Sequence, residues 1–70
     1  MTKEQRDWTE KEVRTIIGFV SGDHYFVNSM TYAILDDVIE DIECSADINF
    51  NLDDVRIAIA RVLMRKFGVD

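Results

Sequence analysis

The chain has 70 residues, of which 47% are hydrophobic and 31% are charged, with three Gly and no Pro. Eight Lys and Arg against fourteen Asp and Glu give a formal net charge of −6. This composition excludes an intrinsically disordered chain, which would contain fewer large apolar residues, and the length is that of one domain.

No apolar run approaches the roughly 18–20 residues that a membrane-spanning helix needs, and the start of the chain does not resemble a signal peptide. The single cysteine excludes an internal disulfide framework and a multi-cysteine zinc site. We therefore expect a soluble, cytoplasmic domain that needs no disulfide.

A first helix is predicted over about residues 9–21. Thr9 and Glu12 have the spacing of a capping box, and Gly22 follows as a residue suited to the C-terminal end of a helix. Thr2 and Gln5 have the same spacing, so the sequence also allows an additional helical turn over residues 2–7. Apolar residues then recur at helical spacing on one face: Val13, Ile16, Ile17 and Val20.

A second helix is predicted over about residues 29–44. Asn28 and Ser29 both suit its N-terminal cap, and Cys44 lies at its end. Its apolar stripe consists of Leu35, Val38, Ile39 and Ile42, with Ile34 at one margin.

Two short segments outside these helices have extended character. Tyr25–Val27 is aromatic and apolar, and residues 45–52 alternate apolar with polar residues. We therefore allow for a minimal two-stranded ribbon between Tyr25–Val27 and Ile48–Phe50, although connectors held against the core would give the same pattern.

The third helix is predicted over residues 52–67. Asn51 suits its cap, and Asp53 follows in the first turn, where the helix dipole favours negative charge. Arg65 and Lys66 occupy the last turn, where cations are favoured, and Gly68 follows. The predicted fold is all-α, a compact three-helix domain.

The third helix is apolar on more than its core face. Val55, Ile59 and Val62 share one side, whereas Ile57 and Met64 point nearly opposite. A core this small typically supplies only about 3–5 kcal/mol, so self-association is a reasonable way to bury the remainder. The candidate residues of a homodimer interface are Ile57, Ala60 and Met64.

The charges are distributed unevenly, because no Lys or Arg occurs between Arg14 and Arg56. A helical wheel places five acids on one arc of the second helix, opposite its apolar stripe: Asp36, Asp37, Glu40, Asp41 and Glu43. We call this arc the acidic face. Like charges at i,i+4 cost a few tenths of a kcal/mol each. The face either is solvated, with cations from the chain ends folding back onto it, or docks on a protein partner with a basic surface.

Few residues suggest chemistry. Asp47-x-Asn49-x-Asn51-x-Asp53 resembles the start of an EF-hand calcium loop, but the loop's glycine and bidentate glutamate positions hold Leu52 and Ala58. His24 and Cys44 are single residues on different segments, and no phosphate loop, zinc-protease motif or nucleophile elbow is present. We therefore expect neither an enzyme nor a bound metal or cofactor.

Two aromatic residues are candidate anchors for a partner. Trp8 and Tyr32 would serve if they are exposed, because binding hot spots are enriched in Trp and Tyr. Aromatic residues more often belong to the core.

The segment Trp8-Thr9-Glu10-Lys11-Glu12-Val13 resembles the opening of Myb/SANT-type three-helix domains. The match covers about one helix. The later tryptophans of that family are absent, and the third helix is apolar where a DNA-reading helix is polar and basic, so no function is carried over. In size and charge the chain is also similar to small acidic inhibitors of phages and mobile elements, including anti-CRISPR and DNA-mimic proteins.

These observations favour a non-enzymatic protein-interaction module. The first hypothesis is a small acidic inhibitor or regulator that docks its acidic face on a basic, nucleic-acid-handling protein. The alternative is a homodimeric adaptor or assembly subunit that binds through the apolar surface of the third helix. A third is a small helical DNA-binding regulator, but the excess of acids would repel phosphates, so we expect no direct nucleic-acid binding and no membrane partner.

Overall fold

A computed structural model describes residues 1–45 and 49–68 of the chain. It contains three helices, α1 (Lys3–Val20), α2 (His24–Ser45) and α3 (Leu52–Phe67), and no strand within the described residues. The predicted compact all-α, three-helix fold is thereby confirmed. None of the helices in the described part of the chain is both long and apolar enough to cross a membrane.

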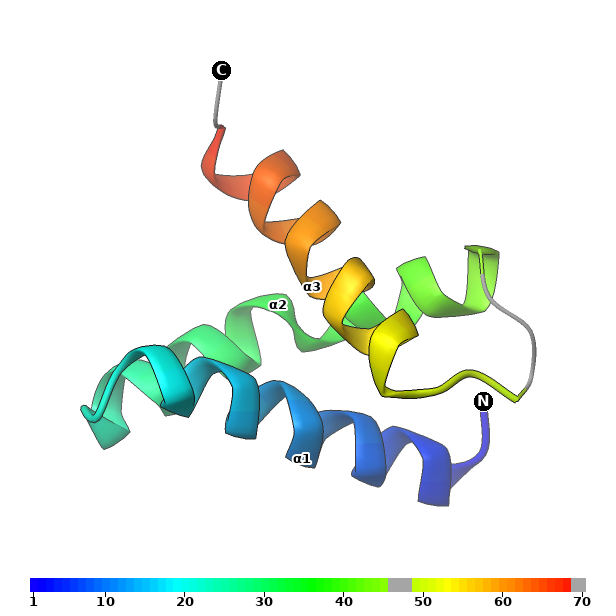
Figure 1. Cartoon of the computed structure of the whole chain (residues 1–70), viewed down its shortest axis with the longest axis horizontal. Coiled ribbons are helices and arrows are strands. Elements are labelled where there is room, and N and C mark those ends of the chain that lie inside the picture. Colours follow the sequence, from blue (N-terminus) through cyan, green and yellow to red (C-terminus); the bar gives the residue numbers. More distant parts are fainter. Residues whose placement is uncertain (46–48, 69–70) are drawn as a thin grey trace.

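The helices α1 and α2 form an antiparallel pair, and α3 crosses α2 (Figure 1). The turn of residues 21–23 joins α1 to α2. From the far end of α2 the chain returns in α3, which begins close to the start of α1 and ends away from it (Figure 1). The α1–α2 turn therefore lies away from α3.

The helix α1 begins at Lys3 and not near residue 9, because the earlier capping box forms. The Thr2 hydroxyl accepts from the Gln5 amide at 3.1 Å, and the Gln5 side-chain oxygen accepts from the Thr2 amide at 2.9 Å. Thr9 lies inside α1, fully buried, and its hydroxyl donates to the Gln5 carbonyl at 2.7 Å. The segment from Trp8 to Val13 is therefore not the opening of a helix.

The helix α2 begins at His24, several residues before its predicted start. The Asp23 carboxylate accepts from the Tyr25 amide at 2.9 Å and so caps the helix in place of Asn28 or Ser29. The predicted ribbon is wrong, because Tyr25–Val27 form the first turn of α2 and their backbone groups belong to that helix. Ile48 lies outside the described residues, and Phe50 is not in a strand.

The helix α3 has the predicted bounds and ends. Asn51 and Asp54 form a capping box at its start, where the Asn51 side chain accepts from the Asp54 amide at 3.1 Å. At its end Gly68 has a φ of 58°, in the left-handed region that glycine adopts at low cost.

The core lies where the three helices meet. The predicted stripe of α2 is buried, and Ile34, expected at its margin, is fully buried. Val20, expected on the apolar face of the first helix, is exposed. The buried apolar residues are Val13, Ile17, Val27, Ile34, Leu35, Val38, Ile39, Ile42, Val55, Ala58, Ile59 and Val62.

Candidate protein-binding surfaces

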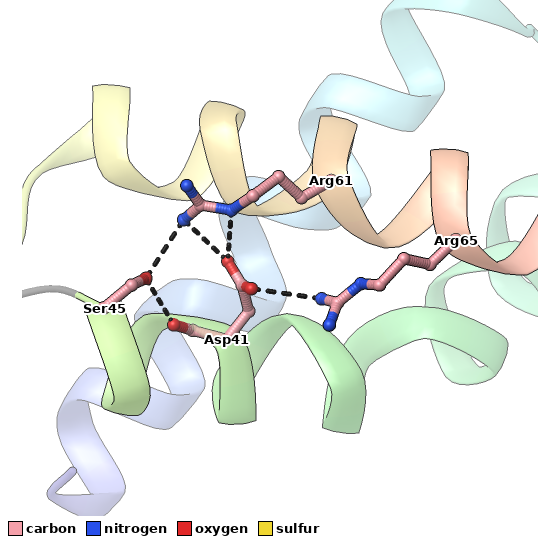
Figure 2. A network of polar contacts seen from close by, with 4 residues as sticks. All are labelled: Asp41, Ser45, Arg61 and Arg65. Atoms are coloured by element: carbon pink, nitrogen blue, oxygen red, sulfur yellow. Dashed lines mark hydrogen bonds and ion pairs between the residues drawn. The ribbon is translucent and has the colours of Figure 1, made fainter.

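The acidic face of α2 meets the basic residues of α3 along the seam between the two helices. Asp41 is the centre of this seam (Figure 2). One carboxylate oxygen accepts from Arg61 at 2.8 and 2.9 Å, and the other accepts from Arg65 at 3.0 Å. Arg61 also donates to the Ser45 hydroxyl at 3.0 Å, which itself donates to the Asp41 carbonyl at 2.6 Å. The Asp41 side chain is only 12% exposed.

A second contact extends this seam by one helical turn along α2. The Lys66 ammonium lies 2.8 Å from the Asp37 carboxylate and donates to the Ala33 carbonyl at 2.7 Å. The last turns of α3 are thus fastened to α2 by charge, because the last buried residue of that helix is Val62. These contacts offset the like-charge repulsion that the sequence predicts for α2.

Two further acids of the face are paired with the N-terminal part of the chain. Arg6 of α1 donates to Asp36 at 2.9 Å, and the N-terminal amine lies 2.6 Å from the Glu43 carboxylate. Among the described residues, Glu40 is the member of the acidic face without an ion pair. Cations from the chain ends therefore fold back onto this face, which is the arrangement expected if the acidic face is solvated and does not dock on a partner.

A groove of about 350 Å³ follows the seam. Glu40 and Cys44 of α2 line it on one side, and Val62 and Arg65 of α3 line it on the other. Cys44 is exposed and not the small buried residue that its place near the apolar stripe suggests. His24 begins α2 and Cys44 lies near its end, about 30 Å away along the helix, so they cannot form a catalytic pair.

The calcium-loop resemblance corresponds to no metal site in the described residues, where no group of three or more His, Cys, Asp or Glu side chains could hold a metal ion. Asn51 and Asp54 are engaged in the capping box of α3, and Asp53 lies 3.5 Å from Arg56. Asp47, the first position of the resemblance, lies outside the described residues.

The candidate interface residues of α3 are all exposed. Ile57, Ala60 and Met64 follow one another on the side of α3 opposite its buried residues. We call them the α3 stripe. The structure thus places these three residues together on one surface, bordered by Arg56 and Arg61.

The two candidate anchors lie at different ends of the molecule. Trp8 is 37% exposed, and its ring is 5.7 Å from that of Phe50, beside the start of α3. Tyr32 is 68% exposed on α2, and the Arg14 guanidinium lies 5.6 Å from its ring centroid. Arg14 also donates to the Asn28 side chain, and this hydrogen bond links α1 to α2. The two aromatic residues therefore do not form one site.

The three most exposed large apolar residues among those described, Phe19, Val20 and Tyr25, are ones that the sequence patterns did not indicate as a site. Phe19 and Val20 end α1, and Tyr25 and Phe26 lie in the first turn of α2, on either side of the turn at 21–23. Their exposures are 94%, 86%, 82% and 42% in that order. We call these four residues the apolar end. Figure 1 shows that the α1–α2 turn, which carries them, is not covered by α3.

A signal for the apolar end was present in the charge pattern. Between Thr15 and Leu35 the chain has one formal charge, Asp23, whereas charged residues make up 31% of the whole. The carboxylate of Asp23 is engaged in capping α2. The segment that turns from α1 into α2 is therefore both apolar and poor in charge.

No protein-family model, curated protein or solved structure matches this chain. Arguments about function therefore rest on its surfaces.

Proposed function

We propose that this chain is a non-enzymatic protein-binding module whose binding surface is the apolar end. The observation that supports this most is the exposure of Phe19, Val20 and Tyr25, each above 80%. Single exposed hydrophobic residues are common on soluble proteins, but here several occur on the two helix ends that flank one turn, and such accumulation is typical of an interaction site.

The energetics of the apolar end favour a partner. Burial of a large apolar side chain is worth about 1.5–3 kcal/mol relative to leaving it in water. Within the chain, Phe19 and Tyr25 are 94% and 82% exposed, so no other helix covers them. A bound protein would recover this free energy, and aromatic residues are enriched among the few that dominate binding.

The apolar end is also held in place by the fold. Ile17 of α1 and Val27 of α2 are both buried in the core, one turn or less from the exposed residues. Asp23 caps α2 and fixes its first turn. A surface presented on two anchored helix ends loses little conformational entropy on binding.

Site-specific photo-crosslinking in cells of the native host tests this proposal. A benzophenone side chain placed at Phe19 should form covalent adducts with protein, because this position lies in the proposed interface. The same group placed at Lys11, exposed on α1, is the matched control and should form none. The partner identified at position 19 should then bind the purified wild type and lose affinity for the Phe19→Asp variant. Equal labelling at both positions, or none at position 19, would refute the proposal.

The acidic face supports a second proposal, that of an acidic inhibitor competing with nucleic acid for the basic groove of a nucleic-acid-handling protein. The observation in its favour is that Asp36 is 84% exposed in its side chain and that Glu40 is without an ion pair among the described residues. The exposed pair of Asp36 with Arg6 is worth little, so a basic partner could replace Arg6.

Charge-matched variants test the second proposal. Asp36→Lys with Glu40→Lys reverses the exposed part of the acidic face and leaves the Asp41 contacts intact. Glu4→Lys with Asp7→Lys makes the same charge change on α1. A basic partner captured at low salt should be lost with the first variant and kept with the second. If both variants retain it, or both lose it equally, the acidic face is not the binding site.

A further inference from the structure

We propose that a groove beside Trp8 binds an arginine side chain of a partner protein. The groove has a volume of about 500 Å³, and we call it the Trp8 groove. Glu4 and Trp8 of α1 line it, together with Asn49 and Phe50 of the segment that leads into α3. These residues lie away from the last turn of α1, so the inference concerns a second surface and does not depend on the apolar end.

The Trp8 groove presents an aromatic surface and a carboxylate side by side. Glu4 and Trp8 are four residues apart on α1, which places their side chains on the same face of the helix. The ring centroids of Trp8 and Phe50 are 5.7 Å apart, with the ring planes tilted by 54°, and Trp8 is 37% exposed. Part of the indole is therefore open to a bound group.

Charge in the Trp8 groove favours a cation. Glu4 is the one formally charged residue among the described residues that line it, and it has no ion pair with any of the described residues. Asp53 and Asp54 add two carboxylates in the first turn of α3, close to the lining segment. An anion would meet this excess of negative charge, whereas a cation is attracted by the carboxylates and by the face of the Trp ring.

The chain itself shows how such groups hold an arginine. The Arg14 guanidinium lies 5.6 Å from the centroid of the Tyr32 ring. It also donates to the side-chain oxygen of Asn28 and lies 3.8 Å from the Glu10 carboxylate. An aromatic ring, an amide oxygen and a carboxylate thus surround one guanidinium between α1 and α2.

The Trp8 groove has the same three kinds of group, in Trp8, Asn49 and Glu4. None of the Lys and Arg residues in the described part of the chain lines it, so the arginine would come from another protein. Arginine suits these groups better than lysine does, because its planar guanidinium stacks on an aromatic ring and donates to both oxygens of a carboxylate. The ligand class is therefore an exposed arginine of a partner.

Titration of the full chain with short blocked peptides, followed by tryptophan fluorescence, tests the inference. Trp8 is the only tryptophan of the chain, so its emission reports on this groove alone. A glycine peptide with one central arginine should change the emission in a saturable way. The same peptide with citrulline, which keeps the shape of arginine but has no charge, should bind about tenfold or more weakly, and a lysine peptide should lie between the two.

Two variants with the same change of charge locate the binding site. Glu4→Gln should weaken binding of the arginine peptide about fivefold or more, because it removes the carboxylate of the groove. Glu12→Gln, two turns further along α1 and outside the groove, should change the affinity by less than about twofold. Circular dichroism checks that both variants keep the helicity of the wild type.

Four results would overturn the inference. They are no saturable change with the arginine peptide, equal binding of the arginine and citrulline peptides, tighter binding of a glutamate peptide than of the arginine peptide, and equal losses in the two variants. None of them bears on the apolar end, which crosslinking at position 19 tests separately.

Discussion

Two buried threonines of this small core differ in one respect, the partner of the hydroxyl. Both are 0% exposed. The Thr9 hydroxyl donates to the Gln5 carbonyl, whereas the Thr31 hydroxyl has no hydrogen-bond partner among the residues that the structure describes. A buried polar group without a partner costs free energy, and valine has nearly the same shape.

We therefore expect Thr31→Val to leave the free energy of unfolding unchanged or to raise it by up to about 1 kcal/mol. Thr9→Val, the matched control, removes a hydrogen bond and should lower it by about 0.5–1.5 kcal/mol. Urea denaturation of the two variants at one protein concentration measures both effects. Equal destabilisation by the two substitutions would show that the Thr31 hydroxyl is satisfied.

At this scale the sequence predicts which residues share a helix face better than it predicts which of them are buried. Val20 continues the stripe of Val13 and Ile17, but α1 ends beyond the reach of α3, so nothing covers it (Figure 1). Cys44 is exposed as well, because it lines the open groove between α2 and α3. Burial depends on where the other helices end, which local periodicity does not contain.

Among the elements, α3 is the one whose start depends most clearly on a single cap. The Asn51 side chain accepts from the Asp54 amide, and the Asp54 carboxylate accepts from the Asn51 amide at 2.8 Å. Asn51→Ala should lower the free energy of unfolding by about 1 kcal/mol. Asn49→Ala, at an exposed position just before the cap, should change it by much less. Thermal unfolding of the pair measures the difference, and equal effects would contradict the capping role.

The seam between α2 and α3 should depend on Asp41. Its carboxylate contacts two arginines and is largely buried, so Asp41→Asn should cost about 1–2 kcal/mol. Asp36→Asn removes one exposed pair with Arg6 and should cost at most about 0.5 kcal/mol. Chemical denaturation of the two variants measures both losses of unfolding free energy. An equal loss of unfolding free energy in the two variants would contradict the stabilising role given to Asp41.

The helix ends show why some elements are predicted better than others. Asn51 and Gly68 are well-separated signals, and α3 has the expected bounds. In α1 and α2, capping residues recur within a few positions, as with Thr2 and Thr9, and the sequence alone does not choose between them. The clustering of acids on α2 was predictable, whereas their pairing with Arg61, Arg65 and Lys66 depends on the path of α3.

At the scale of the whole molecule, the arrangement of the three helices explains why the apolar end is exposed. Three short helices cannot cover one another everywhere, and α3 crosses α2 away from the α1–α2 turn (Figure 1). The core therefore ends at Ile17 and Val27, and the apolar residues between them in the chain are exposed. The first two of the three function hypotheses drawn from the sequence used the acidic face and the α3 stripe, because periodicity reveals both. The exposure of the apolar end depends on the path of α3, which periodicity does not give.

The most direct test of the central claim is a titration of the ¹⁵N-labelled wild type with the protein that crosslinks at position 19, followed by amide chemical shifts. No substitution is needed, and each amide reports on its own surroundings. If the apolar end is where this chain binds protein, shifts should change on addition of that protein at residues 19–26, and should stay constant at Ile57, Ala60 and Met64. Changes confined to α3, or to the acidic residues of α2, would contradict the account.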